Sequence, residues 1–208
     1  MPQSQRQRIL RTAADLATIK GLDGLSIGGL ASQLHMSKSG LYAYFKSKED
    51  LQMATVRLVL DIQDEVINRP AMQASAGLER LCVLCEGFFS YLALFPGGCF
   101  MASLGAEFNA RPGLLRDTLV TYQGKWLQLI ADQVAEAQRS GSLGYFDKPE
   151  QIAFELNSYL HLANDAFVLS QDRAFIKMGR RAIARLLGLP AIDEQEEGLR
   201  APSSGQCA

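Results

Sequence analysis

Apolar side chains recur every three or four positions along most of the chain, which is the spacing of one face of an α-helix. The first such stretch spans residues 4–20 and ends at Gly21, a residue type that commonly follows the last helical turn. Ser26 and Ser37 each precede a short apolar stretch and are suited to cap helices that begin directly after them. The first quarter of the chain therefore predicts three helices joined by short turns.

A longer helix is predicted to start after Ser47, because Ser47-Lys48-Glu49-Asp50 has the form of a capping box. We expect it to reach about Asn68 and to end at Arg69-Pro70. The later helices are expected at about 75–95, 97–109, 113–139, 149–170 and 173–187, with Asp147 and Glu150 spaced as an N-cap and N3 pair around Pro149. Since no strand pattern or internal repeat stands out, the fold is predicted to be all-α.

The composition fits a protein with a substantial core. The chain has 208 residues, of which 48% are hydrophobic and 21% charged. Its N-terminus is polar and basic with no apolar segment behind it, and the most apolar stretch, LCVLCEGFFSYLALF, is interrupted by Glu86 and is too short to span a bilayer. We therefore expect a cytoplasmic protein with no membrane partner.

Cys82, Cys85, Cys99 and Cys207 are the four cysteines, and in a cytoplasmic chain we expect reduced thiols. Cys82 and Cys85 form a CxxC pair, a spacing found in redox and zinc sites. A structural zinc ion needs four ligands, and neither a second CxxC pair nor a nearby histidine supplies them. We expect these cysteines to act as small core residues and predict no metal and no cofactor, although a redox role for the pair stays open.

Charge is distributed unevenly along the chain. Residues 1–48 carry seven Lys and Arg against two acidic residues, so their formal charge is +5, whereas residues 49–208 carry −6. An anionic partner is therefore expected to bind the N-terminal quarter.

The basic region contains the stretch SKSGLYAYFKSKEDL, residues 37–51. Two short helices in residues 26–45, braced by a third at 4–20, are typical of a helix-turn-helix unit, whose second helix enters the major groove of DNA. Ser39 and Gly40 are small enough for the first turn of that helix to approach base edges, while Leu41 and Phe45 face inward. Hydroxyls and ammonium groups that could contact phosphates come from Ser37, Tyr42, Tyr44, Lys38, Lys46 and Lys48. A solvated basic turn would explain the lysines but not the tyrosines between them.

Residues 8–51, RILRTAADLATIKGLDGLSIGGLASQLHMSKSGLYAYFKSKEDL, resemble the tetracycline-repressor (TetR) family of bacterial transcription regulators. Weaker similarity to the ligand-binding region of one subgroup continues in residues 95–117. The resemblance implies a three-helix DNA-binding domain and a larger helical domain that dimerises and holds an inducer. By matching position it implies DNA contacts from Ser37, Lys38, Ser39, Gly40, Tyr42, Tyr44, Lys46 and Lys48.

The sequence departs from the family pattern at two places. His35 occupies the turn where the family often has glycine, and histidine is among the residues that tolerate a positive φ. Gly28 and Gly29 stand where relatives often have polar or basic side chains, so phosphate contacts there would be fewer or would use backbone amides.

The expected organisation is a DNA-binding domain at 1–47, an effector-binding and dimerisation domain at 48–189, and a disordered tail at 190–208. Candidate ligand-binding residues combine aromatic and polar types on the predicted helices: Phe88, Phe89, Phe100, Tyr122, Trp126, Asn157, His161 and Asn164. The polar members could equally lie on a solvated or dimer face. A candidate homodimer interface follows the apolar stripe near the end of the chain: Phe167, Phe175, Met178, Ala182, Ile183 and Leu186, with Leu187 beside it.

The favoured function is a repressor, not an enzyme, that binds a palindromic operator in double-stranded DNA as a homodimer and is released by a small-molecule inducer. A DNA-binding regulator without such an inducer is an alternative. A helical enzyme is a second alternative, because helical bundles can hold catalytic carboxylates. Against an enzyme, no Ser-His-Asp arrangement, HExxH motif or Gly-rich phosphate loop is present.

Overall fold

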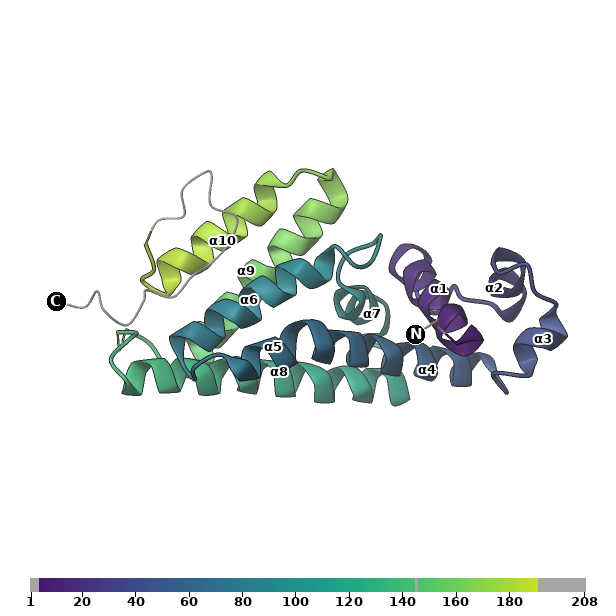
Figure 1. The fold of residues 1–208 in the computed structure, drawn as a ribbon, viewed down its shortest axis with the longest axis horizontal. Helices are drawn as coiled ribbons and strands as arrows, with labels where there is room; N and C mark the ends of the chain where they lie inside the picture. The colour runs from purple at the N-terminus through teal and green to yellow at the C-terminus, as the bar shows by residue number, and fades with distance from the viewer. Residues whose placement is uncertain (1–3, 145, 191–208) are drawn as a thin grey trace. The chain divides into compact units, whose positions relative to one another are not determined.

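A computed structural model describes residues 4–144 and 146–190, and within these ranges the chain forms helices and no strand. The expected tail, apart from Pro190, and Cys207 lie outside these residues. The all-α prediction is confirmed. In chain order (Figure 1), the α-helices are α1 (Gln5–Lys20), α2 (Ile27–Gln33), α3 (Lys38–Tyr42), α4 (Lys48–Gln63), α5 (Arg69–Gln73), α6 (Leu78–Leu92), α7 (Phe100–Phe108), α8 (Leu114–Arg139), α9 (Pro149–Ser170) and α10 (Ala174–Leu186), and a π-helical turn, Asp64–Asn68, separates α4 from α5.

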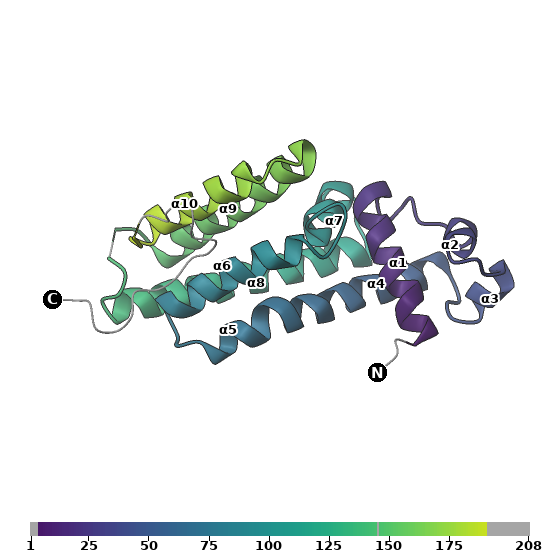
Figure 2. The same ribbon diagram turned by 45° about the horizontal axis from the view of Figure 1, so that its top comes forward.

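Contacts divide the chain into two compact units. The N-terminal unit comprises the residues up to Gln63 together with Ala93–Val120, and the C-terminal unit comprises Asp64–Leu92 together with the residues from Thr121 onward. In the first, α1 packs against α2, α4 and α7, and α2 packs against α3. In the second, α6 packs against the π-turn, α5 and α9, while α9 and α10 lie side by side (Figure 2). The expected end of the DNA-binding domain at residue 47 is a statement about function, which these contacts do not test, and it stays a prediction.

The predicted caps of the first helices are present. The Ser26 hydroxyl accepts from the Gly29 backbone N–H at 3.0 Å, and the Ser37 hydroxyl accepts from Gly40 at 3.0 Å. Gly21 ends α1 with a φ of +79°. At the start of α4, Ser47 Oγ accepts from the Asp50 N–H at 3.1 Å. The Asp50 carboxylate, however, accepts from the backbone N–H of Lys46 and not from that of the N-cap Ser47, so the capping box is only half formed.

The turn between α2 and α3 uses His35 in the left-handed conformation, with a φ of +53°. The His35 N–H donates to the Ser32 carbonyl at 3.2 Å, and the Met36 N–H donates to the Ala31 carbonyl at 2.8 Å. This pair of bonds is the Schellman arrangement that closes many helices. The expectation of a positive φ at His35 is confirmed, and α3 begins three residues later, at Lys38.

The helix expected to stop at Arg69-Pro70 continues instead to Gln73. Proline lacks the N–H that would bond one turn back, and its ring crowds the carbonyl at that position. A π-turn over Asp64–Asn68 directly precedes Pro70, which occupies the first turn of α5, where no intrahelical donor is needed. The prediction of a stop was therefore wrong.

The expected N-cap at Asp147 is also wrong. Lys148 is the N-cap of α9 and makes no side-chain cap bond, while Asp147 Oδ1 accepts from the Lys148 N–H at 2.7 Å. Pro149 at the first helical position compensates, because its fixed φ suits a helix start. No described helix is both long and apolar enough to cross a membrane.

Candidate DNA-binding surface and effector domain

The predicted DNA-contacting residues gather on α3 and the turn that follows it. Leu41 and Phe45 are fully buried, which anchors this segment as expected. Tyr42 and Tyr44 remain 55% and 39% exposed despite their aromatic rings. Seven of the eight predicted residues are exposed, namely Ser37, Lys38, Ser39, Tyr42, Tyr44, Lys46 and Lys48, while Gly40 is half-buried. Hydroxyls and ammonium groups thus share one surface over a buried apolar anchor.

The first turn of α3 is built from small residues that bond to each other. Ser37 Oγ lies 3.1 Å from Ser39 Oγ as well as accepting from Gly40. A Cβ atom at Gly40 would stand 3.1 Å from Ser37 Oγ, so a side chain there would press on the cap. Because Ser39 is small and Gly40 has no side chain, the backbone of this turn is open to a close approach.

Gly28 explains one departure from the family pattern. A Cβ atom at this position would lie 3.0 Å from Cε of Lys38, so the lysine side chain extends across the first turn of α2 where another residue would have a side chain. A larger residue at position 28 would displace the Lys38 ammonium group.

Lys48 is the predicted DNA-contacting residue whose charge is already partnered. Its Nζ lies 2.9 Å from Asp23 Oδ1 and also donates to the Asp23 backbone carbonyl. The Asp23 carboxylate accepts from Arg111 as well, at 3.1 Å. Hydrogen bonds from Lys48 and Arg111 hold the pKa of Asp23 below its usual range. The position of Lys48 is therefore set by an acidic residue that the sequence analysis did not single out.

Four of the candidate ligand-binding residues come together between α6, α8 and α9. The Phe88 ring centroid lies 6.4 Å from that of Trp126 and 5.7 Å from that of His161. Trp126 Nε1 donates to Asn157 Oδ1 at 3.0 Å. Burial lowers the pKa of His161, against the opposing effect of Asp165, so its imidazole is neutral at neutral pH. This cluster, which we call the aromatic cluster, combines apolar rings with uncharged polar groups.

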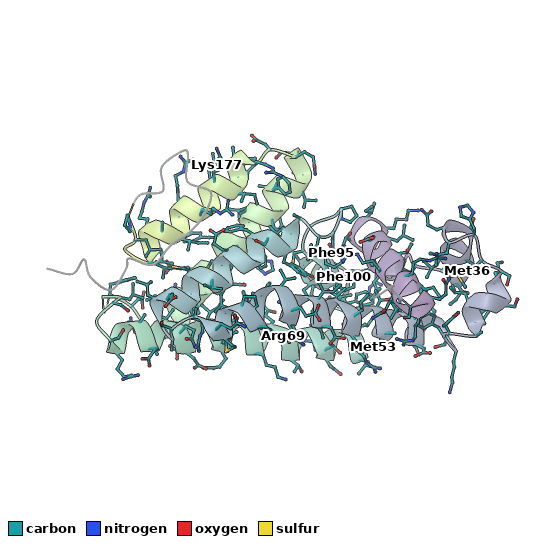
Figure 3. The ribbon with its side chains drawn as sticks, in the orientation of Figure 1. Met36, Met53, Arg69, Phe95, Phe100 and Lys177 are labelled. Atoms are coloured by element: carbon teal, nitrogen blue, oxygen red, sulfur yellow. The ribbon has the colours of Figure 1, made fainter. Side chains whose placement is uncertain are left out.

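Phe89 borders this cluster, since its ring centroid lies 6.3 Å from that of Phe88 in an edge-to-face arrangement, and the other three candidates lie elsewhere. Phe89 packs beneath Arg180, whose guanidinium carbon is 5.0 Å from the ring centroid, and Arg180 in turn bonds the Glu86 carboxylate through two nitrogens. Phe100 belongs to the N-terminal unit, where its ring lies 6.4 Å from Phe95 (Figure 3). Tyr122 is half-buried, and Asn164 is buried and donates to Asp165 at 2.8 Å. The sequence could not separate these residues, because aromatic residues fill cores throughout a helical protein.

An apolar groove runs between α9 and α10. The groove has a volume of about 260 Å³, and each helix lines it with residues at i, i+3, i+4 and i+7. The lining residues are Tyr159, Leu162, Ala163 and Ala166 of α9 and Phe175, Met178, Gly179 and Ala182 of α10. Leu162 is 69% exposed and Met178 is 52% exposed. The outer side of α10 is charged, as the exposed Lys177 illustrates (Figure 3).

The predicted dimer stripe needs one correction. Ile183 is fully buried within its own chain, as is nearly all of the neighbouring Leu187, so neither offers surface to a partner. Phe167, Phe175, Ala182 and Leu186 are half-buried, and Met178 is exposed. The apolar stripe of α10 therefore has an inner part that packs within the chain and an outer part that stays at least partly exposed, and sequence spacing alone did not separate the two.

Cys82, Cys85 and Cys99 are buried, reduced thiols, as expected for small core residues. Burial raises the pKa of Cys82 to about 12 and raises that of Cys85 as well. Within the described ranges, no three His, Cys, Asp or Glu side chains gather as metal ligands would.

Comparison with known proteins accounts for both halves of this arrangement. Residues 9–54 match the profile of bacterial regulatory proteins of the tetR family, and residues 77–183, just over half of the chain, match the tetracyclin repressor-like C-terminal domain. The chain belongs to the TetR family. It is therefore a DNA-binding transcription regulator with an N-terminal helix-turn-helix and a C-terminal helical ligand-binding domain.

Among TetR-family relatives, the transcriptional regulator AcuR of Cereibacter sphaeroides is 25% identical over 150 residues, which cover 71% of this chain and 68% of AcuR. Solved structures share the fold at lower identity. A TetR-family regulator from Cytophaga hutchinsonii has a TM-score of 0.75 at 19% identity, covering 90% of this chain and 97% of that one. AibR, solved in complex with isovaleryl coenzyme A and operator DNA, also has a TM-score of 0.75 at 19% identity. The match covers 90% of this chain and 100% of the AibR chain.

Proposed function

We propose that this protein is a ligand-responsive repressor that binds a palindromic operator as a homodimer and leaves it when a small-molecule inducer binds. The observation that carries the proposal is the surface on α3 and its flanks. Seven predicted DNA-contacting residues are exposed there, above the buried Leu41 and Phe45. Small residues in the first turn suit base edges, and lysines and tyrosines suit phosphates.

A homodimer is supported by the groove between α9 and α10. Two helices that each present apolar residues at i, i+3, i+4 and i+7 can pack against their two copies as a four-helix bundle. A two-fold dimer places two copies of α3 on one face of DNA, where half-sites one helical turn apart are about 34–36 Å from each other. The operator is then expected to be a palindrome.

An inducer site is supported by the aromatic cluster of Phe88, Trp126, Asn157 and His161. Apolar rings with a few uncharged polar groups are typical of small-molecule sites. Because AibR binds isovaleryl coenzyme A, acyl-coenzyme A thioesters are the first class of compound to test. An inducer acts only through its different affinities for the DNA-binding and non-binding conformations.

Selection of bound DNA from a random pool tests the DNA-binding part. We expect a palindromic consensus bound by two chains, with affinity that falls steeply as salt rises. Enrichment of no sequence, or of a single half-site bound by one chain, would overturn the proposal. Screening acyl-coenzyme A thioesters and small organic acids against the selected DNA then tests the inducer. If every compound leaves binding unchanged, the protein is a regulator without an inducer of these classes.

The dimer part is tested with two matched methionine variants. Met178→Asp places a charge in the groove, whereas Met72→Asp places it on α5 at similar exposure, 47% against 52%. We expect Met178→Asp to sediment as a monomer that keeps its helical content and loses palindrome binding, while Met72→Asp remains a dimer. Equal behaviour of the two variants would remove the groove from the interface.

A further inference from the structure

The turn between α1 and α2 binds a carboxylate from a distant part of the chain. The backbone N–H groups of Leu22 and Asp23 donate to the two oxygens of Glu107, on α7, at 2.7 and 2.9 Å. Gly21 precedes them with a φ of +79°, and a Cβ atom there would lie 2.9 Å from Glu107 Oε1. Successive amides that point at one anion form a cradle for it. The glycine, the two amides and the carboxylate therefore fit together as one unit.

The same turn is also held by α4. The buried amide of Gln52 donates to the Leu22 carbonyl at 3.0 Å, and Lys48 donates to the Asp23 carbonyl. Peptide groups of the turn are thus bonded on their N–H side by α7 and on their carbonyl side by α4. Since α2 begins at Ile27, directly after this turn, the direction in which α2 leaves α1 depends on both sets of bonds.

The Asp23 side chain extends this connection to Lys48. It bridges Lys48 at 2.9 Å and Arg111 at 3.1 Å, and Arg111 also stacks on Phe108, with its guanidinium carbon 5.5 Å from the ring centroid. Loss of the bonds between Glu107 and the turn would remove one of the two sets of contacts that hold the backbone carrying Asp23. The ammonium group of Lys48 would then be less firmly positioned.

Residues before α7 hold α1 in a similar way. The Gly97 N–H donates to Thr18 Oγ1 at 3.1 Å, and a Cβ atom at Gly97 would collide with the Thr18 carbonyl oxygen at 2.0 Å. Arg11 donates to the Leu94 carbonyl and stacks on Phe95, with its guanidinium carbon 4.5 Å from the ring centroid. Residues 94–111 are therefore bonded to α1 and to the turn at several independent points.

We propose that Glu107 is a positioning residue for DNA binding: its carboxylate fixes the turn that orients α2 and α3 and, through Asp23, fixes Lys48. The proposal rests on the DNA-binding function proposed above. It reverses what charge alone predicts, because an acidic side chain in a DNA-binding unit repels phosphate. Removal of that charge should strengthen binding if Glu107 is only a charge, and weaken it if Glu107 positions the turn.

The test uses the full chain and the DNA sequence selected with the wild-type protein. Glu107→Gln keeps the length of the side chain but leaves only one carbonyl oxygen for two N–H donors, and Glu107→Asp keeps the charge but is too short to reach both. Asp61→Asn, on the exposed side of α4, is the matched control because it removes the same charge from the same unit. We expect both Glu107 variants to bind the selected DNA about tenfold more weakly, which is the scale of one charge-assisted hydrogen bond. Asp61→Asn should bind as tightly as wild type or slightly more tightly.

Two readouts separate positioning from misfolding. Titration at high concentration gives the fraction of active chains, and the ratio of affinities for selected and scrambled DNA gives specificity. Positioning predicts an unchanged active fraction and a lower ratio. The proposal is overturned if Glu107→Gln binds the selected DNA as tightly as wild type, or if only the active fraction falls. It is also overturned if the affinities for selected and scrambled DNA fall by the same factor, so that their ratio is unchanged. Failure of the wild-type protein to select any sequence would instead count against the proposed function itself.

Discussion

Replacement of Gly179 by alanine tests how closely α9 and α10 approach each other. Gly179 is buried in the interior of α10, and a Cβ atom there would stand 2.8 Å from Cβ of Ala163 and 3.4 Å from the ring of Phe89. Two carbon atoms in ordinary contact are about 3.5–4.0 Å apart. Since Ala163 has no flexible end that could move aside, the two helices must separate by roughly 1 Å at this point.

Two effects of opposite sign decide the outcome. Alanine is a better helix former than glycine by about 1 kcal/mol. Insertion of a methyl group into a filled interior costs about 1–3 kcal/mol. Gly124→Ala isolates the first effect, because Gly124 lies within α8 and a Cβ atom there meets nothing within 4 Å. We therefore expect Gly124→Ala to stabilise the fold by about 1 kcal/mol and the two variants to differ by about 1–3 kcal/mol.

Urea unfolding of both variants, followed by circular dichroism, measures this difference. All samples need the same chain concentration, because the stability of a dimer depends on it. An equal gain in the free energy of unfolding for Gly179→Ala and Gly124→Ala would refute the close approach of α9 and α10. The groove between these helices would then have a different shape from the one described.

Three further predictions concern single side chains. Because burial lowers the pKa of His161, the unfolded chain takes up the proton first as pH falls below about 6.5, so stability should fall from there towards the folded pKa. Urea midpoints at pH 5.5 and 7.5 should differ more in wild type than in His161→Gln. Because the thiol pKa of Cys82 is about 12, iodoacetamide at pH 8 should modify Cys82 in urea but not in the folded protein, as mass spectrometry of the peptides would report. Lys46→Ala should weaken binding to all DNA sequences and reduce the salt slope by about one unit in filter-binding titrations, and an unchanged slope would remove Lys46 from the phosphate contacts.

Local chemistry made the helix-turn-helix predictable from the sequence. Ser26, Ser37 and Gly21 act through bonds to residues within a few positions, so their roles follow from the order of residues alone. His35 adopts the left-handed conformation for the same local reason. The inward direction of Leu41 follows from helical spacing.

Features that depend on distant residues were not predictable in this way. The helix passes through Pro70 because a π-turn adjusts the backbone before it, and the sequence carries no simple signal for such a turn. Ile183 and Met178 share one apolar stripe, and only the packing of α10 against its own chain tells which of them is covered. The hydrogen bond between Glu107 and Leu22 joins residues 85 positions apart, so no local sequence pattern predicts it.

The N-terminal unit is discontinuous, since the chain leaves it after Gln63 and returns at Ala93. This has a consequence for synthesis. A ribosome adds about 5–20 residues each second, so Leu22 and Asp23 are synthesised several seconds before Glu107. During that time their backbone N–H groups lack the carboxylate to which they donate in the folded protein. A nascent chain that ends at Gln63 contains every residue proposed to contact DNA but not the segment that secures the turn before α2. Full affinity for an operator is therefore expected to arise only after more than half of the chain has been translated.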